Sequence, residues 1–298
     1  MKITWFGHAA FSIEGVNSSG EAVKIILDPY NYPACGGYLP IDEEADIVSI
    51  SHHNERYHSD LSSIRGDYEL IDALELVGDS RTCRGVEFAA FEVYETEDGA
   101  GPNSLVKFEL EEVTVAHQGD LGHPLEGDAL EFLRDIDVLL ALAGGPPTIK
   151  VDDLADLVAR TRPPLVLPMH YKTPKVNLDL QPVEDFLATC TGYPVETPGC
   201  PELIVSRDTL PAETTIIVLD HARFGPWRYR RLSPRSRSCS AAPPPSWTRT
   251  PRPHRAGRDR CRSRGSSPRS DRARPGRRPR SASPRRHPPH HEEDRIRP

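Results

Sequence analysis

The stretch from Asp46 to Leu61 reads DIVSISHHNERYHSDL, an apolar run followed at once by three histidines and two acids. The run IVSI has the composition of a buried strand. Side chains that follow a strand are held in place by the sheet, so ligands gathered there indicate a binding site. However, an arginine and a tyrosine stand among the candidate ligands, and the metal chemistry of the stretch is therefore in question.

Two further apolar runs lead into similar residues. VTVA is followed by His117 and Asp120, and PLVLPM is followed by His170. One strand that ends in histidine is ordinary, but three such ends that meet at one edge would combine imidazole and carboxylate ligands, as metal sites do. His52, Asp120 and His170 are thus the first candidates for a metal centre.

Charge divides the chain of 298 residues into two parts. Residues 1–223 hold 15 Lys+Arg and 39 Asp+Glu, whereas residues 224–298 hold 22 Arg, no Lys and 5 acids. The second part is rich in Arg, Pro and Ser and has too few apolar residues for a core, so we expect a disordered tail. The abrupt change is what a shifted reading frame through GC-rich DNA would encode. A functional basic arm that binds anions is the alternative.

Composition also excludes several classes of protein. The six cysteines form no CxxC pair, which argues against a zinc ribbon and a dense disulfide framework. The start MKITWFGHAAF is unlike a signal peptide, and no apolar run reaches the ~18 residues of a membrane span. We expect a soluble cytoplasmic protein with no membrane partner. The excess of acids in residues 1–223 predicts that this part repels nucleic acid.

The order of elements indicates a layered α/β or α+β sandwich. Helices are predicted at PLEGDALEFLRDI, at VDDLADLVARTR with its apolar face, and at PVEDFLATC, which starts after Pro182. DVLLALAGG and PLVLPMH are typical of strands buried on both faces. The other predicted strands are KITWFG, AFSIE, VKIILDP, DIVSIS, LELVG, VEFAAFEVY, SLVKFEL, VTVAHQG and TTIIVLD.

Five segments in this order resemble the metallo-β-lactamase fold: MKITWFGHAAFSIE, IILDPY, ADIVSISH, VAHQGDLGH and LPMHYKTP. More narrowly they are similar to the β-lactamase superfamily 3 type of metal-dependent hydrolase, relatives of ascorbate-6-phosphate lactonase. The resemblance covers roughly residues 1–222. It implies a four-layer αββα sandwich with a metal site along one edge of its two sheets. It also implies metal-activated water that attacks an ester, a lactone or a phosphoester of a small molecule.

The resemblance assigns roles position by position. His52 fits the first histidine of the family motif HxHxDH, Asp120 the bridging aspartate, and His170 the last ligand. These three would hold the metal and carry catalysis, with His58 and Glu95 as further candidate ligands. Substrate contacts are expected from His8 in FGHA and from Lys172 beside His170.

Other motif positions depart from the family. Asn54, Arg56 and Tyr57 occupy the places of its second histidine, aspartate and last histidine. An arginine cannot bind a metal ion, because it stays protonated and offers no acceptor. We therefore hypothesise that Arg56 pairs with Asp120 and replaces one ion; an Arg56 side chain directed away from Asp120 would refute this.

Three interpretations follow from this degenerate motif. One divalent ion (Zn, Mn or Fe) could remain, bound by imidazole and carboxylate ligands. No metal would bind if the site is dead, and the chain would then be a silent binding or scaffold protein. Two ions are the third possibility. His53 and His58 also have a plain interpretation as exposed loop residues, and His117 and His123 as residues that only hydrogen-bond their loop.

Overall fold

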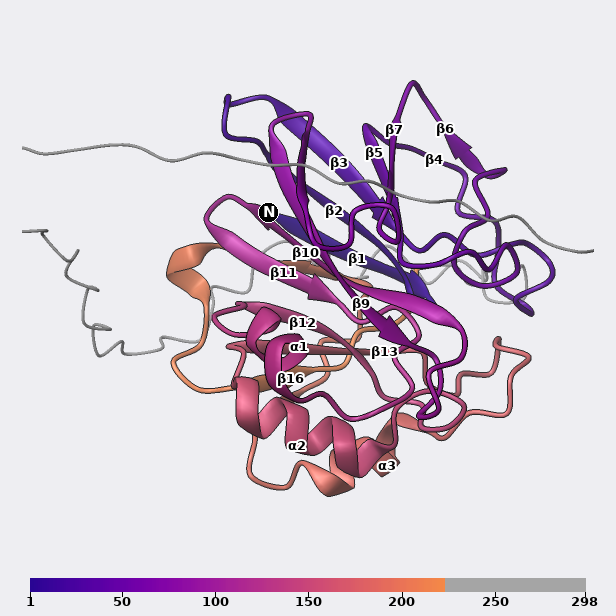
Figure 1. Cartoon of the computed structure of the whole chain (residues 1–298), viewed down its shortest axis with the longest axis vertical. Helices are drawn as coiled ribbons and strands as arrows, with labels where there is room; N and C mark the ends of the chain where they lie inside the picture. Colours follow the sequence, from indigo (N-terminus) through magenta and orange to yellow (C-terminus); the bar gives the residue numbers. More distant parts are fainter. Residues whose placement is uncertain (223–298) are drawn as a thin grey trace, which may run out of the picture. The chain divides into compact units, whose positions relative to one another are not determined.

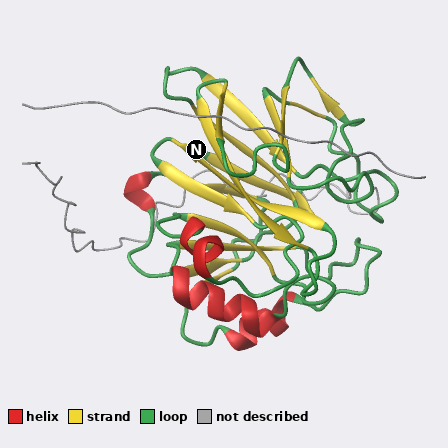
Figure 2. Ribbon diagram, viewed as in Figure 1, coloured by secondary structure: helices red, strands yellow, loops and turns green. Residues whose placement is uncertain are grey.

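The computed structural model describes residues 1–222, and the predicted basic tail lies outside the described residues. Two mixed sheets form the centre of this part of the chain (Figures 1 and 2). The first sheet has the order β15 (Glu202–Ile204), β1 (Lys2–Gly7), β2 (Ala10–Val16), β3 (Ala22–Leu27), β5 (Ile47–Ile50) and β7 (Glu69–Asp72). The second has the order β14 (Val195–Glu196), β16 (Thr215–Ile217), β13 (Leu165–Met169), β12 (Val138–Leu142), β11 (Val113–His117), β10 (Pro102–Leu110), β9 (Val86–Tyr94) and β8 (Ser80–Cys83). A short ribbon pairs β4 (Glu43–Glu44) with β6 (Ile64–Arg65).

The main core lies between the two sheets. Alternate residues of the first sheet, such as Ile3, Trp5 and Phe11, share one buried cluster with Phe88 and Phe108 of the second. Since side chains along a strand alternate between faces, each strand of the first sheet contributes its inward row to this core. Hydrophobic burial between the sheets therefore fixes their face-to-face arrangement.

The outer face of the first sheet is covered by loops. Phe6 and Ile26 point away from the main core and pack with Tyr30, Tyr38 and Val176 in a second buried cluster. The loop residues come from segments that follow β3 and β13, so these segments are tied to the sheet that carries the site. Irregular chain here takes the place of a helical layer.

Helices lie against the second sheet (Figure 2). They are α1 (Gly127–Phe132), α2 (Val151–Thr161) and α3 (Val183–Thr189), and a 3-10 turn spans Arg207–Thr209. The buried side chains of α2 are Leu154, Leu157 and Val158, the face expected from the sequence. None of the helices in the described residues has the length and apolar character needed to cross a membrane.

Most predicted elements are confirmed, including the three helices and the fully buried strands β12 and β13. One prediction is wrong: LELVG forms turns and an isolated bridge at Val77 instead of a strand. The strands in this region are β7 and β8 on either side of it. β8 carries the sequence SRTC, whose exposed polar residues hide the pattern of a strand.

Candidate metal centre

Four histidines and an aspartate gather where the carboxyl ends of β1, β5, β11 and β13 meet. Asp120 lies at the centre of the group. Its Oδ2 is 2.9 Å from His58 Nε2 and 3.8 Å from His52 Nε2, and its Oδ1 is 3.2 Å from His170 Nε2. Burial alone would raise the pKa of Asp120, but the charges of His58 and His170 hold this pKa well below its usual value. Asp120 is therefore an ionised carboxylate facing three imidazoles.

The turn after β11 positions Asp120. Asn103 is fully buried on β10, accepts a hydrogen bond from the backbone N–H of Asp120 at 3.0 Å and donates its amide to the carbonyl of Gln118 at 3.0 Å. Gly119 between them has a φ of 57°, and a Cβ there would lie 2.1 Å from Asn103 Oδ1. Only glycine permits this close approach, which explains the GDLG sequence.

Hydrogen bonds determine the tautomer of His52. Ser51 Oγ donates to Asp28 Oδ2 at 2.6 Å, so its single hydrogen is used there. The contact of 2.9 Å between Ser51 Oγ and His52 Nδ1 must then be donated by Nδ1–H. Burial and the nearby His58 lower the pKa of His52 to about 4. Its Nε2 consequently carries a lone pair directed toward Asp120 and Glu95.

His58 reaches the cluster through a tight turn. The carbonyl of Asn54 accepts the backbone N–H groups of Tyr57, His58 and Ser59 at 2.8–3.1 Å. This turn buries His58 completely, and its Nδ1 donates to Asp28 Oδ2 at 2.9 Å. Burial alone would lower the pKa of His58, but Asp120 and Asp28 raise it to about 10. The interpretation of His58 as an exposed loop residue is wrong, and His58 stays a candidate ligand.

His170 and His8 enter the cluster from strained turns. His8 lies between β1 and β2 with a φ of 51°, and His170 follows β13 with a φ of 54°. The carbonyl of His8 accepts the backbone N–H of His170 at 2.9 Å and the indole N–H of Trp5 at 3.0 Å. Left-handed backbone at two bulky residues is costly, and such strain is concentrated at functional sites.

Glu95 borders the cluster on its open side. Its Oε1 lies 3.7 Å from His52 Nε2, and 39% of its side chain is exposed. Burial and the charge of Asp120 raise the pKa of Glu95. Gly101 leaves room for this side chain, because a Cβ there would lie 2.8 Å from Glu95 Cδ. The acid is thus held at the rim by the turn between β9 and β10.

One sequence prediction is corrected. Arg56 does not pair with Asp120: its side chain is exposed, its Nε donates to the carbonyl of Ala34 at 3.1 Å, and His58 occupies the place beside Asp120. Lys172 is exposed and donates to the carbonyl of Leu178 at 2.7 Å, and its contact with a substrate stays a prediction.

His117 and His123 have structural roles, whereas His53 is a surface residue. His117 contacts the carbonyl of Ala9 through Nε2 and accepts from the backbone N–H of Gly119, so both nitrogens are engaged. The two nitrogens of His123 are engaged with backbone atoms in the same way. His53 is exposed and pairs with Asp72 at 2.8 Å. Neither His117 nor His123 has a nitrogen left for the cluster.

Buried nitrogen atoms without a hydrogen-bond partner show that the residues present fit a metal ion. Among them are both ring nitrogens of His8, Nε2 of His52, Nε2 of His58 and Nδ1 of His170, and Oδ1 of Asp120 also has no partner. Buried polar atoms are nearly always paired, so several unpaired imidazole nitrogens around one carboxylate call for an explanation. Imidazole and carboxylate are the donors that divalent transition metals prefer.

Comparison with known proteins agrees with this fold. Residues 2–170 match the family model described as the beta-lactamase superfamily domain, and the chain belongs to this family. A UPF0173 protein of Pyrococcus furiosus is 30% identical over 193 residues, which cover 58% of this chain and 84% of that protein. A UPF0173 metal-dependent hydrolase of Pelotomaculum thermopropionicum is 26% identical over 200 residues, covering 58% and 85%.

A solved structure supports the same conclusion. It is a proposed zinc-dependent hydrolase of the metallo-β-lactamase superfamily from Thermotoga maritima, and it is 31% identical to this chain. The TM-score is 0.58, and the match covers 73% of this chain and 97% of that one. The metallo-β-lactamase fold expected from the five sequence segments is confirmed.

Proposed function

We propose that the chain is a metal-dependent hydrolase whose reduced site holds one divalent ion at Asp120. The observation that carries this proposal is the cluster of unpaired buried imidazole nitrogens around an ionised carboxylate. Asp120, His58 and His170 would hold the ion, and His52 lies beside them. The donor set suits Zn, Mn or Fe. A bound ion would supply Lewis acidity and lower the pKa of water toward neutrality.

The chain's own side chains would bind the ion and handle protons. Asp28 holds His58 by accepting Nδ1–H, which directs Nε2 toward Asp120. Ser51 Oγ holds His52 by accepting its Nδ1–H. Glu95 lies at the rim with a raised pKa and can take a proton from water that approaches His52.

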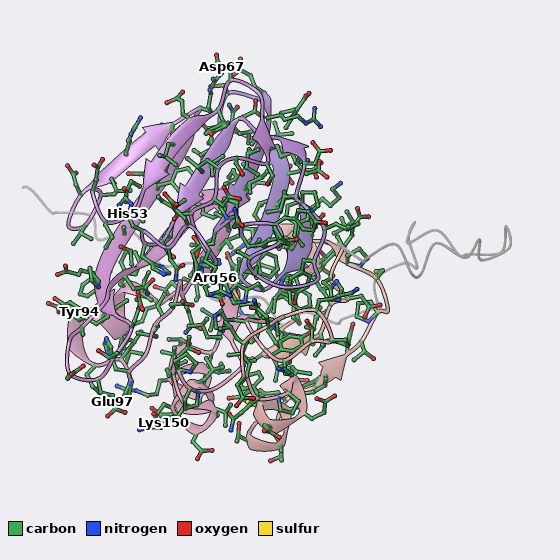
Figure 3. All side chains as sticks on the ribbon, turned by 90° about the vertical axis from the view of Figure 1, so that its right-hand side faces the viewer. His53, Arg56, Asp67, Tyr94, Glu97 and Lys150 are labelled. Atoms are coloured by element: carbon green, nitrogen blue, oxygen red, sulfur yellow. The ribbon has the colours of Figure 1, made fainter. Side chains whose placement is uncertain are left out.

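A surface hollow of about 680 Å³ lies beside the turn after β9, and neither Glu95 nor any residue of the histidine cluster lines it. Its lining includes Tyr94 and Thr96, which flank Glu95, together with His123 and the ion pair of Lys150 with Glu97. Figure 3 shows Tyr94, Glu97 and Lys150 on the same side of the molecule. We propose that the substrate is an ester, a lactone or a phosphoester of a small molecule.

Metal content and hydrolysis test the proposal together. Purified full-length protein should carry a stoichiometric divalent ion and hydrolyse members of a panel of lactones, carboxylic esters and phosphoesters. Asp120→Asn should abolish turnover, whereas Lys172→Ala should not. Less than about a tenth of an ion per chain after metal supplementation would refute the proposal and favour a silent binding protein.

A further inference from the structure

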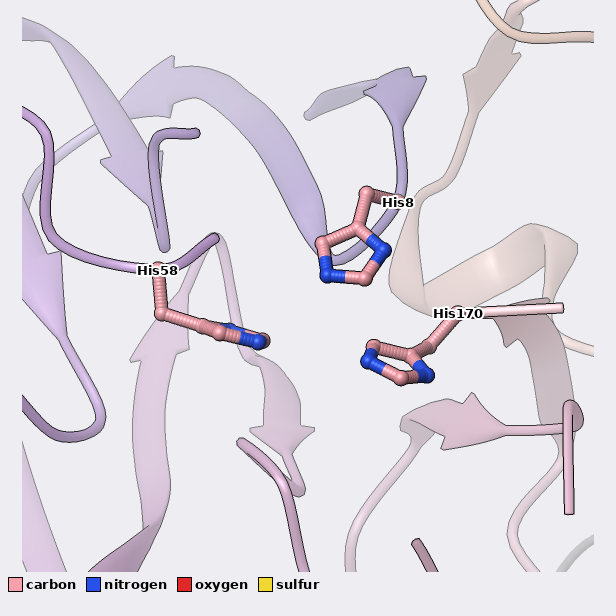
Figure 4. Close-up of side chains that lie close together, drawn as sticks. All are labelled: His8, His58 and His170. Carbon is pink, nitrogen blue, oxygen red and sulfur yellow. The ribbon is translucent and has the colours of Figure 1, made fainter. Parts of the chain in front are cut away.

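Three histidine rings from distant parts of the chain face one small space (Figure 4). One nitrogen from each of His8, His58 and His170 lies within 4.8 Å of the other two. The ring centroids are 4.1 Å apart for His8 and His170 and 5.1 Å apart for His8 and His58. Such a separation places one nitrogen of each ring within reach of a single ion, which His58 would bind after losing a proton.

The buried imidazole of His8 makes no hydrogen bond. It is 1% exposed, and neither of its ring nitrogens has a hydrogen-bond partner. A buried polar group without a partner costs about 1–3 kcal/mol. An apolar residue would fill the same volume without that cost, so the imidazole is explained by a ligand that it binds.

The backbone holds His8 in this position despite the strain. Gly7 has a φ of 122°, and a Cβ there would lie 2.4 Å from the ring of Tyr38. The carbonyl of His8 is bonded to the N–H of His170, so the two rings are brought together by their own main chains. Tyr57 packs against the outer side of His8, with ring centroids 5.2 Å apart.

The second group with metal-ligand spacing is less suitable. It consists of Asp28, His52 and His58. Asp28 already accepts hydrogen bonds from Ser51 N, Ser51 Oγ and His58 Nδ1, at 2.6–2.9 Å. Its carboxylate therefore orients His58 rather than offering a free oxygen to a metal ion.

We infer that His8 is a metal ligand, and that His8, His58, His170 and Asp120 form a three-histidine, one-carboxylate site. This inference rests on the proposed function, since it concerns the same ion. His8 and His58 replace the ligands lost at Asn54, Arg56 and Tyr57. The ion is thereby moved from the strand-end loop toward the turn between β1 and β2, and His52 with Glu95 flanks it on the open side.

Metal binding to full-length protein tests the role of His8. The protein is stripped with a chelator and titrated with Zn²⁺ and Co²⁺ against a competing chelator. His8→Ala should weaken binding more than 100-fold, beyond the ~10–100-fold expected for an outer partner, and should change the visible spectrum of bound Co²⁺. His8→Gln serves as a second variant if His8→Ala does not fold.

His117→Ala is the matched control, because His117 is equally buried but has both nitrogens hydrogen-bonded. It should lower the melting temperature of the stripped protein and leave metal affinity within a few-fold of the wild type. His8→Ala should leave the melting temperature of the stripped protein nearly unchanged. Equal metal affinity and an equal Co²⁺ spectrum in His8→Ala and wild type would overturn the inference, while the proposed function would stand. A wild type that binds no ion would overturn both.

Discussion

Replacing Asp28 by asparagine should weaken metal binding without removing a ligand. Asp28 accepts the Nδ1–H of His58 at 2.9 Å and both donors of Ser51 at 2.6 and 2.8 Å. Asparagine keeps one acceptor oxygen, which can still serve Ser51 N. Its NH₂ group then faces two donors, so the hydrogen bond to His58 is lost and the ring is no longer held toward Asp120.

The size of the effect follows from that single hydrogen bond. A hydrogen bond to a charged acceptor contributes about 1.5–3 kcal/mol, which corresponds to a change of roughly 10- to 100-fold in affinity. Mutations of partners that orient metal-binding histidines fall in the same range. We therefore expect the Kd for Zn²⁺ to rise by about 10- to 100-fold in Asp28→Asn, measured by chelator competition at a fixed pH.

Asp137→Asn provides the control for general damage. Asp137 is also buried, accepts the backbone N–H of Thr114 at 3.0 Å and pairs with Arg207 at 2.6 Å, away from the histidine cluster. It should lower stability and leave the Kd unchanged. A Kd for Asp28→Asn equal to that of the wild type, or an equal loss in both variants, would refute the reasoning.

Three other expectations concern the same region. The pKa of His58 is raised to about 10. The contribution of His58 to the free energy of unfolding is therefore complete below pH 6.5 and is lost as the pH rises to 10. The pKa of His52 is lowered to about 4, so stability falls as the pH drops from 6.5 to 4. Urea unfolding of chelator-treated protein should thus show greatest stability near pH 6.5, and a steady rise up to pH 9 would contradict this. Gly119→Ala should lower the free energy of unfolding by about 1–3 kcal/mol more than Gly127→Ala. The two glycines have a similar φ, but a Cβ at Gly127 would meet no atom. Equal urea midpoints of the two variants would contradict this. Lys172→Ala should leave kcat/KM within twofold of the wild-type value. A tenfold loss would instead support the predicted contact of Lys172 with the substrate.

The sequence predicted much of the fold because strand and helix patterns are local. The period-2 strands of the first half and the apolar face of Val151–Thr161 need no tertiary information to be recognised. β7 and β8 were missed because their partly exposed edge positions carry polar residues. Their pairing with neighbouring strands, not their own composition, makes them strands.

The sequence placed the main candidate ligands just after predicted strands, and it named His58, Glu95 and His8 only as further candidates. The sequence by itself determined that His52, Asp120 and His170 each follow a strand, which predicts that they lie in the same region. Only the tertiary structure decided the rest: a turn closed on the carbonyl of Asn54 carries His58 inward and leaves Arg56 outside, and the turn between β1 and β2 brings His8 against His170. Such turns depend on hydrogen bonds between residues far apart in the chain, and spacing along the sequence does not encode those contacts.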